Sequence, residues 1–246
     1  MTPAKRLTFL DLEFDRLSIG EAARAIAAKA DRCEPFAYVV TPNIDHLVRL
    51  PELHAHYRNA WLTLSDSLIL EYLAKARAID LPAAPALDIF ETLARTYVRA
   101  RDRVTVIGGS QATIDMLASR FGLANLRWFD VPHDLHDAAA TRTACVDFII
   151  ANPAPFVFLA VASPQQEMIA SECLARGGAI GVALCCGASL GFLSGERLRA
   201  PSWVKSRNLA WLYSLVATRI RLWPRYLIDG PQILRLWMKW RAAPQA

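Results

Sequence analysis

Two short apolar segments of the chain each end in a small polar cluster. Residues 36–40 are followed by Thr41 and Asn43, whereas residues 61–64 are followed by Asp66. Short runs rich in β-branched and aromatic residues, each ahead of a helical pattern, are typical of buried parallel strands. Ligands of such sheets bind beyond the carboxyl ends of the strands, so we expect these polar side chains to share one rim. A carboxylate beside hydroxyl and amide groups is suited to act as a general base.

Helix capping is the competing interpretation of Asp66. The cluster Ser65-Asp66-Ser67 precedes a helical pattern over residues 68–78. Polar residues at that position most often accept hydrogen bonds from the first free N–H groups of a helix. For an isolated cluster of this kind we expect a cap more often than a catalytic acid, so the catalytic interpretation depends on the other motifs.

A glycine turn is a candidate contact for a diphosphate. Residues 103–107 predict a strand that leads through Gly108-Gly109-Ser110 into a helix over residues 111–121. Glycines let backbone N–H groups approach a ligand, and the start of a helix favours an anion. A single Gly-Gly-Ser is no dinucleotide fingerprint, however, and equally serves to turn the chain.

A second polar cluster follows the strongly apolar segment 155–162. After Ser163 and Pro164, the residues Gln166 and Glu167 fall in the first turn of the next expected helix. Proline and glutamate are common there for structural reasons alone. Amides and an acid at the mouth of a central strand are equally suited to hold sugar hydroxyls.

The last segment of the chain is basic and rich in tryptophan. Residues 202–246 contain eight Lys and Arg against the single acid Asp229, and five of the seven tryptophans. Aromatic rings interleaved with cations on helices are suited to an anionic membrane surface. Nucleic acid is the competing partner of a basic, aromatic tail, and a helical hairpin packed on the core is the simplest interpretation. We expect the membrane, and no nucleic acid.

Arginines of this region are candidates to stabilise a departing diphosphate. Guanidinium groups stay protonated and match the geometry of phosphate oxygens, and Arg199, Arg221 and Arg225 lie in or next to the basic segment. Many enzymes that transfer sugars from nucleotide diphosphates hold a metal with an Asp-x-Asp motif, which this sequence lacks. We therefore expect neither a metal nor another cofactor. The alternative is that these arginines are solvated helix-face residues.

The pattern of elements predicts an α/β fold. The chain has 246 residues, of which 54% are hydrophobic and 21% charged, enough for one substantial core. We expect a Rossmann-like, mostly parallel sheet flanked by helices over residues 1–201, and a basic, Trp-rich helical appendage over residues 202–246. The expected strands cover residues 7–14, 36–40, 61–64, 103–107, 126–129, 155–162 and 179–184.

Cysteine usage and the amino terminus indicate a cytoplasmic protein. The five cysteines lie mostly in apolar runs and have no spacing suited to zinc, so we expect reduced core residues. Asp11, Glu13 and Asp15 are incompatible with a signal peptide. No apolar run reaches the roughly 20 residues that span a bilayer, so membrane contact is expected to be peripheral.

The order of the motifs resembles the WecG/TagA/CpsF glycosyltransferases, glycosyltransferase family 26. The resemblance extends from about Leu10 to Tyr226, and several landmarks in the right order are more specific than any one of them. The landmarks are Thr41-Pro42-Asn43, Asp66, Asp88, Gly108-Gly109, Pro164-Gln165-Gln166-Glu167, residues 187–195, Arg199-Ala200-Pro201 and Trp211-Leu212-Tyr213.

The resemblance implies an inverting transfer of a sugar from a UDP-sugar to a polyprenyl-diphosphate-linked sugar. This reaction takes place at the cytoplasmic membrane face during the synthesis of cell-surface polysaccharides. Asp66 becomes the expected base, with Thr41 and Asn43 around the reacting sugars. The resemblance also implies substrate contacts from Asp88, Gly108, Gly109, Gln166, Glu167 and Arg199, and from Arg221 and Arg225 carried over the site by the appendage.

Several positions depart from the family pattern. Serine replaces a glycine after the catalytic acid, alanines replace two glycines near a strand end, and uncharged residues replace three charged ones. These departures bear on the identity of the sugars more than on the reaction type. They are Ser67, Ala160, Ala162, Gln165, Ala210 and Ser214.

Two other functions compete with glycosyl transfer. A nucleotide-dependent oxidoreductase requires a Gly-x-Gly-x-x-Gly turn after the first strand, which does not occur. A non-catalytic nucleotide- or membrane-binding module is the other alternative, and it gives no reason for the position of Asp66. A homo-oligomer is compatible with glycosyl transfer and with the binding module, because an apolar tail surface can pair with a second subunit or with lipid.

Overall fold

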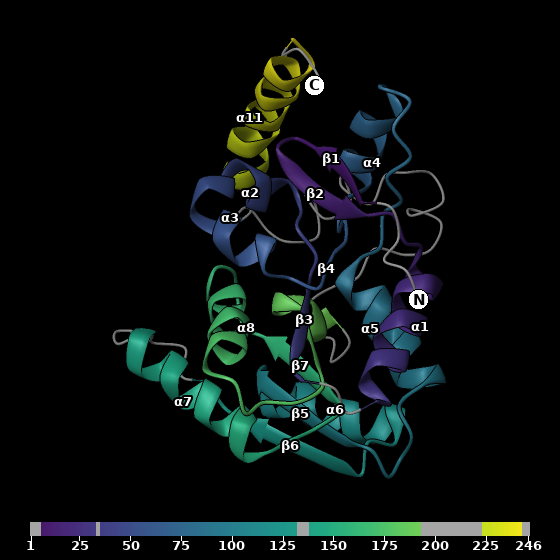
Figure 1. The fold of residues 1–246 in the computed structure, drawn as a ribbon, viewed down its shortest axis with the longest axis vertical. Coiled ribbons are helices and arrows are strands. Elements are labelled where there is room, and N and C mark those ends of the chain that lie inside the picture. The colour runs from purple at the N-terminus through teal and green to yellow at the C-terminus, as the bar shows by residue number, and fades with distance from the viewer. Residues whose placement is uncertain (1–5, 33–34, 132–137, 193–222, 243–246) are drawn as a thin grey trace.

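The centre of the molecule is a six-stranded parallel sheet with the strand order β4-β3-β8-β7-β5-β6 (Figure 1). The computed structural model describes residues 6–32, 35–131, 138–192 and 223–242. The predicted α/β fold with a parallel sheet is confirmed, although the strand order differs from that of the dinucleotide-binding folds. The strands are β3 (Ala37–Val40), β4 (Leu62–Thr63), β5 (Arg103–Gly108), β6 (Asn125–Phe129), β7 (Phe156–Ala160) and β8 (Val182–Cys185).

Helices cover both faces of this sheet, as Figure 1 shows for α1 and α5 on one side and α7 and α8 on the other. Because side chains alternate along a strand, Val104 and Val106 enter one core while Ile107 enters the other. The first core receives α1 (Ile19–Ala30), α5 (Ala86–Thr96) and α6 (Gln111–Phe121). The second receives α3 (Leu50–Arg58), α4 (Leu68–Lys75), α7 (Ala138–Ala151) and α8 (Gln165–Arg176).

The amino-terminal segment corrects a prediction. The single strand expected over residues 7–14 is a hairpin of β1 (Arg6–Phe9) and β2 (Leu12–Asp15). Leu10 and Asp11 form its two-residue turn with φ angles of 52° and 61°, and positive φ at both central residues matches the right-handed twist of a hairpin. The apolar pattern hid this turn because Leu10 itself is buried.

The hairpin is tied to the edge of the sheet through Asp15. This buried carboxylate accepts hydrogen bonds from the backbone N–H of Thr63 at 2.8 Å and from the Arg6 side chain at 3.2 Å. Burial raises the pKa of Asp15, and these two partners oppose that rise. The hairpin therefore holds strand β4, which leads directly to Asp66.

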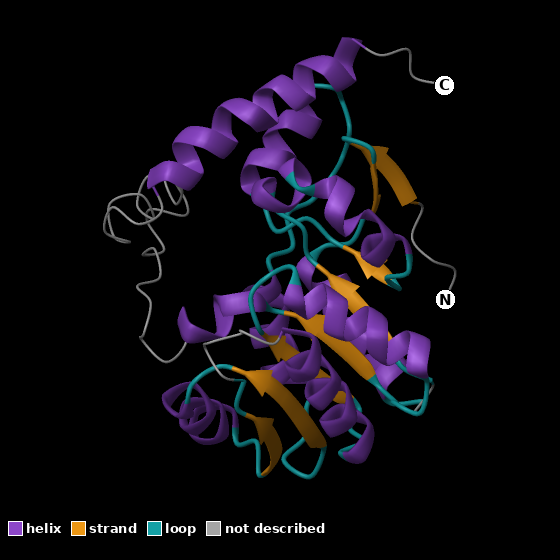
Figure 2. Cartoon of the chain, turned by 90° about the vertical axis from the view of Figure 1, so that its left-hand side faces the viewer, coloured by secondary structure: helices purple, strands orange, loops and turns teal. Residues whose placement is uncertain are grey.

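Helix α11 (Trp223–Ala242) packs against the body of the protein. Ile233 is buried, the Trp237 indole donates to the Leu73 carbonyl at 3.1 Å, and the rings of Trp240 and Phe9 meet edge to face at 5.2 Å. Figure 2 shows α11 lying across the end of the molecule that contains α2 (Ile44–Val48) and the hairpin. In the described part of the chain, no helix combines the length and apolar content needed to cross a bilayer.

The rest of the predicted appendage, residues 202–222 and 243–246, lies outside the described residues. The proposed boundary between residues 201 and 202 therefore stays a prediction. The expectation of reduced core cysteines is met at Cys145, Cys173, Cys185 and Cys186, which are free and buried. Cys33 lies outside the described residues.

Candidate active site

Three neighbouring strands bring Thr41, Asp66 and Cys186 to one rim of the sheet. Strand β3 lies between β4 and β8 and pairs with both in parallel, so the three carboxyl ends face the same way. The Asp66 N–H donates to the carbonyl of Pro42 at 3.0 Å, which holds the two strand ends together. The polar clusters that follow β3 and β4 do lie side by side.

Asp66 does not cap the helix that follows it. The hydroxyl of Ser67 accepts the N–H of Leu70 at 3.3 Å and caps α4 instead. The carboxylate of Asp66 accepts a hydrogen bond from the backbone N–H of Ala86, the first residue of α5. Since the residue before α5 is Pro85, which has no capping side chain, Asp66 supplies that acceptor from another part of the chain.

The surroundings of Asp66 make its carboxyl group a weak acid. Burial, followed by the negative charge of Asp88 in the first turn of α5, raises the pKa of Asp66 from 3.8 to about 7. The hydrogen bond from Ala86 opposes that rise without cancelling it. As a whole residue, Asp66 is only partly buried. A general base is most effective when its pKa lies near the working pH, and Asp66 meets that condition.

Thr41 and Asn43 have structural partners of their own. The Thr41 hydroxyl is buried and donates to the Cys185 carbonyl at 3.4 Å, which joins the ends of β3 and β8. The Asn43 side chain accepts the N–H of His46 at 3.4 Å and begins α2 as its cap. Both residues therefore shape the rim beside Asp66.

The glycine turn follows β5 at the same edge of the sheet. Gly108 and Gly109 both have φ angles of +80°, a region that favours glycine. A Cβ on Gly108 would lie 2.9 Å from the carbonyl oxygen of Ala160 on the neighbouring strand. Ser110 then caps α6 by accepting the N–H of Thr113 at 3.2 Å. The turn thus has a packing reason for its glycines, and it also presents a helix start to the rim.

Gln166 and Glu167 are turned into the protein. Their exposed fractions are 4% and 1%, and the Gln166 side chain donates to the Glu167 carboxylate at 3.0 Å. The side-chain oxygen Oε1 of Gln166 accepts the N–H of Gly187 at 2.7 Å, so the Gln166 side chain fixes the turn that follows β8. Burial raises the pKa of Glu167. In this arrangement the two side chains are buried, and Gln166 holds the backbone that follows β8.

Comparison with known protein families identifies the chain. The model of the glycosyl transferase WecG/TagA/CpsF family matches residues 7–246, nearly the whole sequence. The chain belongs to this family. No curated protein matches it significantly. Membership makes the protein a glycosyltransferase and implies sugar transfer in the synthesis of cell-surface polysaccharides.

Some departures from the WecG/TagA/CpsF pattern have a structural reason. Ser67 provides the cap of α4. Ala160 lies beside the glycine turn, where its methyl group is 3.8 Å from the position that a Cβ on Gly109 would take. The side-chain oxygen Oε1 of Gln165 accepts from the Arg142 guanidinium at 3.5 Å. Ala210 and Ser214 lie outside the described residues.

Most of the arginines that the sequence predicts to contact a diphosphate lie outside the described residues. Arg199 and Arg221 are among the residues that the structure does not describe, and Arg225 lies near the start of α11 without a described side chain. No cation of the described residues is among the causes that set the Asp66 pKa. Within the described ranges, no group of three or more His, Cys, Asp and Glu side chains is placed to hold a metal ion.

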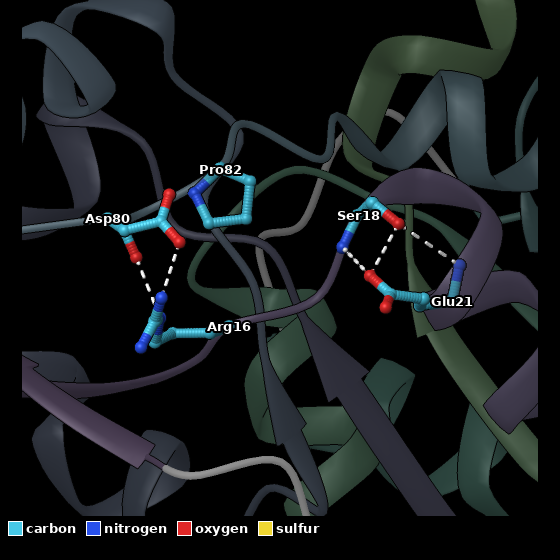
Figure 3. Close-up of a pocket in the computed structure, with 5 residues that line it drawn as sticks. All are labelled: Arg16, Ser18, Glu21, Asp80 and Pro82. Atoms are coloured by element: carbon cyan, nitrogen blue, oxygen red, sulfur yellow. Dashed lines mark hydrogen bonds and ion pairs between the residues drawn. The ribbon is translucent and has the colours of Figure 1, made fainter.

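A depression of about 420 Å³ lies next to residues 76–85, the connector between α4 and α5 (Figure 3). On one side Arg16 forms an ion pair with Asp80, and on the other the Ser18 hydroxyl and backbone bond to Glu21 as the capping box of α1. Arg16 is thus paired with Asp80, and Glu21 is bound to Ser18. The pair of Arg16 and Asp80 ties the connector to the segment between β2 and α1.

Sequence reasoning named Asp88 on α5 as a substrate contact but missed the contribution of the α5 backbone to the surroundings of Asp66. Ala86 contributes a backbone N–H, which no side-chain motif reveals. Cys186 lies close enough to Asp66 for the carboxylate charge to raise the pKa of its thiol. Pro85 was the one signal in the sequence for this contact. A proline before a helix has no side-chain acceptor for the first free N–H groups, so another part of the chain must supply one.

Proposed function

We propose that this protein transfers a sugar, with inversion, from a UDP-sugar to a polyprenyl-diphosphate-linked sugar at the cytoplasmic face of the membrane. The observation that carries the proposal is the position of Asp66, a residue at the rim of the sheet whose carboxyl pKa is raised to about 7. Membership of the WecG/TagA/CpsF family supplies the reaction class.

In the proposed reaction Asp66 removes the proton from the acceptor hydroxyl as that oxygen attacks the anomeric carbon of the donor sugar. The new glycosidic bond forms while the bond from the anomeric carbon to the β-phosphate oxygen breaks, and UDP leaves with the electron pair. Thr41 and Asn43, next to Asp66 on the rim, are proposed to contact the reacting sugars. Asp88 has a second proposed role, because its charge keeps Asp66 basic enough to accept a proton.

Positive charge must meet the departing diphosphate. We assign this role to Arg199, Arg221 and Arg225, together with the helix start after Gly108 and Gly109. Gln166 and Glu167 are proposed to act through the turn after β8, which Gln166 holds.

Peripheral docking to an anionic membrane is proposed for the carboxy-terminal segment. Leu234, Leu236 and Met238 are exposed on α11, as are the cations Arg235, Lys239 and Arg241. A helix surface that mixes apolar and basic side chains suits the boundary between headgroups and acyl chains.

The test is to incubate the protein with a panel of UDP-sugars and a short-chain polyprenyl-diphosphate sugar. We expect release of UDP together with a lipid that is heavier by one sugar, and a product whose anomeric configuration is opposite to that of the donor. Asp66→Asn should lower turnover by at least roughly a hundredfold, the usual scale for general-base catalysis. Retained turnover in a folded Asp66→Asn protein would refute the assigned base, and retention of configuration would refute the inverting mechanism.

A further inference from the structure

A depression of about 490 Å³ lies at the edge of the sheet opposite to Asp66. It is lined by Arg103 and Asn125, the first residues of β5 and β6, and by Asn152, which follows α7 and precedes β7. Because all strands of this sheet are parallel, the beginnings of these strands mark its amino edge, whereas Asp66 follows a strand at the carboxyl edge. The depression is therefore separate from the proposed active site.

Three arginines line this depression, Arg101, Arg103 and Arg127, which we call the arginine site. All three are exposed. No Asp or Glu lines the depression, and within the described residues none of these guanidinium groups has an ion pair. The arginine site thus concentrates three positive charges without a countercharge from the described part of the chain.

The strand register explains why two of these arginines converge. Arg103 pairs with Asn125 and Thr105 pairs with Arg127, so all four side chains lie on one face of the sheet. Arg103 and Arg127 are diagonal neighbours on adjacent strands, within reach of each other for side chains of this length. Nearby like charges repel each other, and an anion bound between the two guanidinium groups would offset that repulsion.

Hydrogen bonds hold the walls of the arginine site in place. The Asn125 amide donates to the Arg101 carbonyl at 2.9 Å and fixes the loop that carries Arg101 over the start of β6. The buried Thr105 hydroxyl donates to the Asn152 carbonyl at 3.0 Å and fixes the end of α7 against β5. The backbone positions of the three arginines are therefore set before any ligand arrives.

We propose that the arginine site binds a free, phosphate-bearing small molecule with at least two negative charges. Guanidinium groups form paired hydrogen bonds with phosphate oxygens, and the volume of the depression is within the range of small-molecule sites. Figure 1 places β6 and α11 at opposite ends of the longest axis of the molecule. A membrane that contacts α11 would leave the arginine site facing away from it, so a free anion fits this position better than a lipid headgroup.

The test uses inorganic diphosphate as the probe and titration calorimetry of the full-length protein in moderate salt. The variant is Arg103→Gln with Arg127→Gln, and the matched control is Arg77→Gln, an exposed arginine after α4. We expect the double variant to bind diphosphate roughly tenfold or more weakly, because it loses two charge-assisted contacts. The Arg77→Gln protein should bind like the wild type.

Equal binding by the wild type, the double variant and the control would overturn the proposal, because the diphosphate would then lie elsewhere, such as beside Asp66. Absence of measurable binding to the wild type would overturn it as well. A third outcome is that the protein does not bind free diphosphate but binds vesicles of anionic phospholipid through Arg103 and Arg127. That result would overturn the proposal of a free ligand and identify a lipid headgroup as the ligand. Circular dichroism checks the fold, and Arg101→Gln repeats the test at a loop position if the double variant misfolds.

Discussion

At the scale of single residues, the surroundings of Asp66 act on its protonation in two opposite directions. Its carboxylate caps α5 through the N–H of Ala86, and its raised pKa fits it to accept a proton. The hydrogen bond and the start of the helix favour the ionised form, while burial and Asp88 favour the protonated one. The second pair of effects prevails, which places the pKa in the range useful for catalysis.

The pH dependence of activity follows from this balance. Because Asp66, as the proposed base, must be ionised to accept a proton, we expect kcat/KM to rise with pH through a value of about 7 in the wild type. Asp88→Asn removes the neighbouring negative charge and should move the rising limb to lower pH. Asp115→Asn, at an exposed position on α6, is the control and should leave the limb in place. An unshifted limb in Asp88→Asn would show that Asp88 does not tune the base.

The same pKa predicts that Asp66 destabilises the folded protein at high pH. The folded-state pKa of about 7 lies above the ordinary value of 3.8. The contribution of Asp66 to the free energy of unfolding is therefore most favourable below pH 3.8, where the group is protonated in both states, and that contribution is lost as the pH rises through 7. We expect Asp66→Asn to raise the melting temperature by several degrees at pH 8 and by less at pH 5. Thermal unfolding at the two pH values measures the difference, and a lower melting temperature at pH 8 would contradict it.

At the scale of elements, the carboxyl edge of the sheet depends on close contacts between loops. Gly108 lies where strand β5 approaches β7, and Gln166 ties α8 to the turn after β8. Each contact joins elements that are far apart in the sequence. The site therefore forms only when the whole edge is assembled.

Gly108→Ala tests this close packing. The substitution places a Cβ at a φ of +80° and 2.9 Å from the Ala160 carbonyl and the Val161 side chain. We expect a loss of about 2–4 kcal/mol in the free energy of unfolding, combining backbone strain with overpacking. Gly122→Ala is the matched control, because its φ is +64° with no atom within 4 Å, so it reports the strain alone. Equal losses in urea unfolding would exclude a packing role for Gly108.

At the scale of the whole molecule, the described part of the carboxy-terminal segment has two surfaces. Ile233, Trp237 and Trp240 hold α11 on the body of the protein, whereas Leu234 and Met238 are exposed. The spacing of these residues places each group on its own stripe of the helix. Removing the entire segment would expose Phe9 and the end of α4 to solvent. A loss of membrane binding after such a deletion could then result from unfolding instead of from loss of the docking surface.

Substitution of the exposed stripe separates these two roles. We expect Leu234→Ser with Met238→Ser to weaken binding to vesicles of anionic phospholipid roughly tenfold, because burial of two apolar side chains is lost. Leu174→Ser on α8 is the control, since Leu174 is also exposed but lies far along the chain from α11. Unchanged co-sedimentation of the double variant would rule out this face of α11 as the docking surface.

The sequence by itself determined the α/β fold, the positions of the strands that lead to the site and the family of the chain. Apolar runs at Tyr38 and Phe158 are buried on both faces, and their strands follow from local hydrophobicity and the polar residues that end them. The turn at Leu10 escaped prediction because its buried side chain continued the apolar pattern.

Only the tertiary structure decided which groups surround Asp66 and where charges gather. The N–H of Ala86 and the charge of Asp88 act on Asp66 from a helix that begins 20 residues later in the chain, and the pairing of two strands makes Arg103 and Arg127 diagonal neighbours. Hydrogen bonds, desolvation and charge interactions depend on distance in space. Local sequence sets the elements, but strand order and register set those distances.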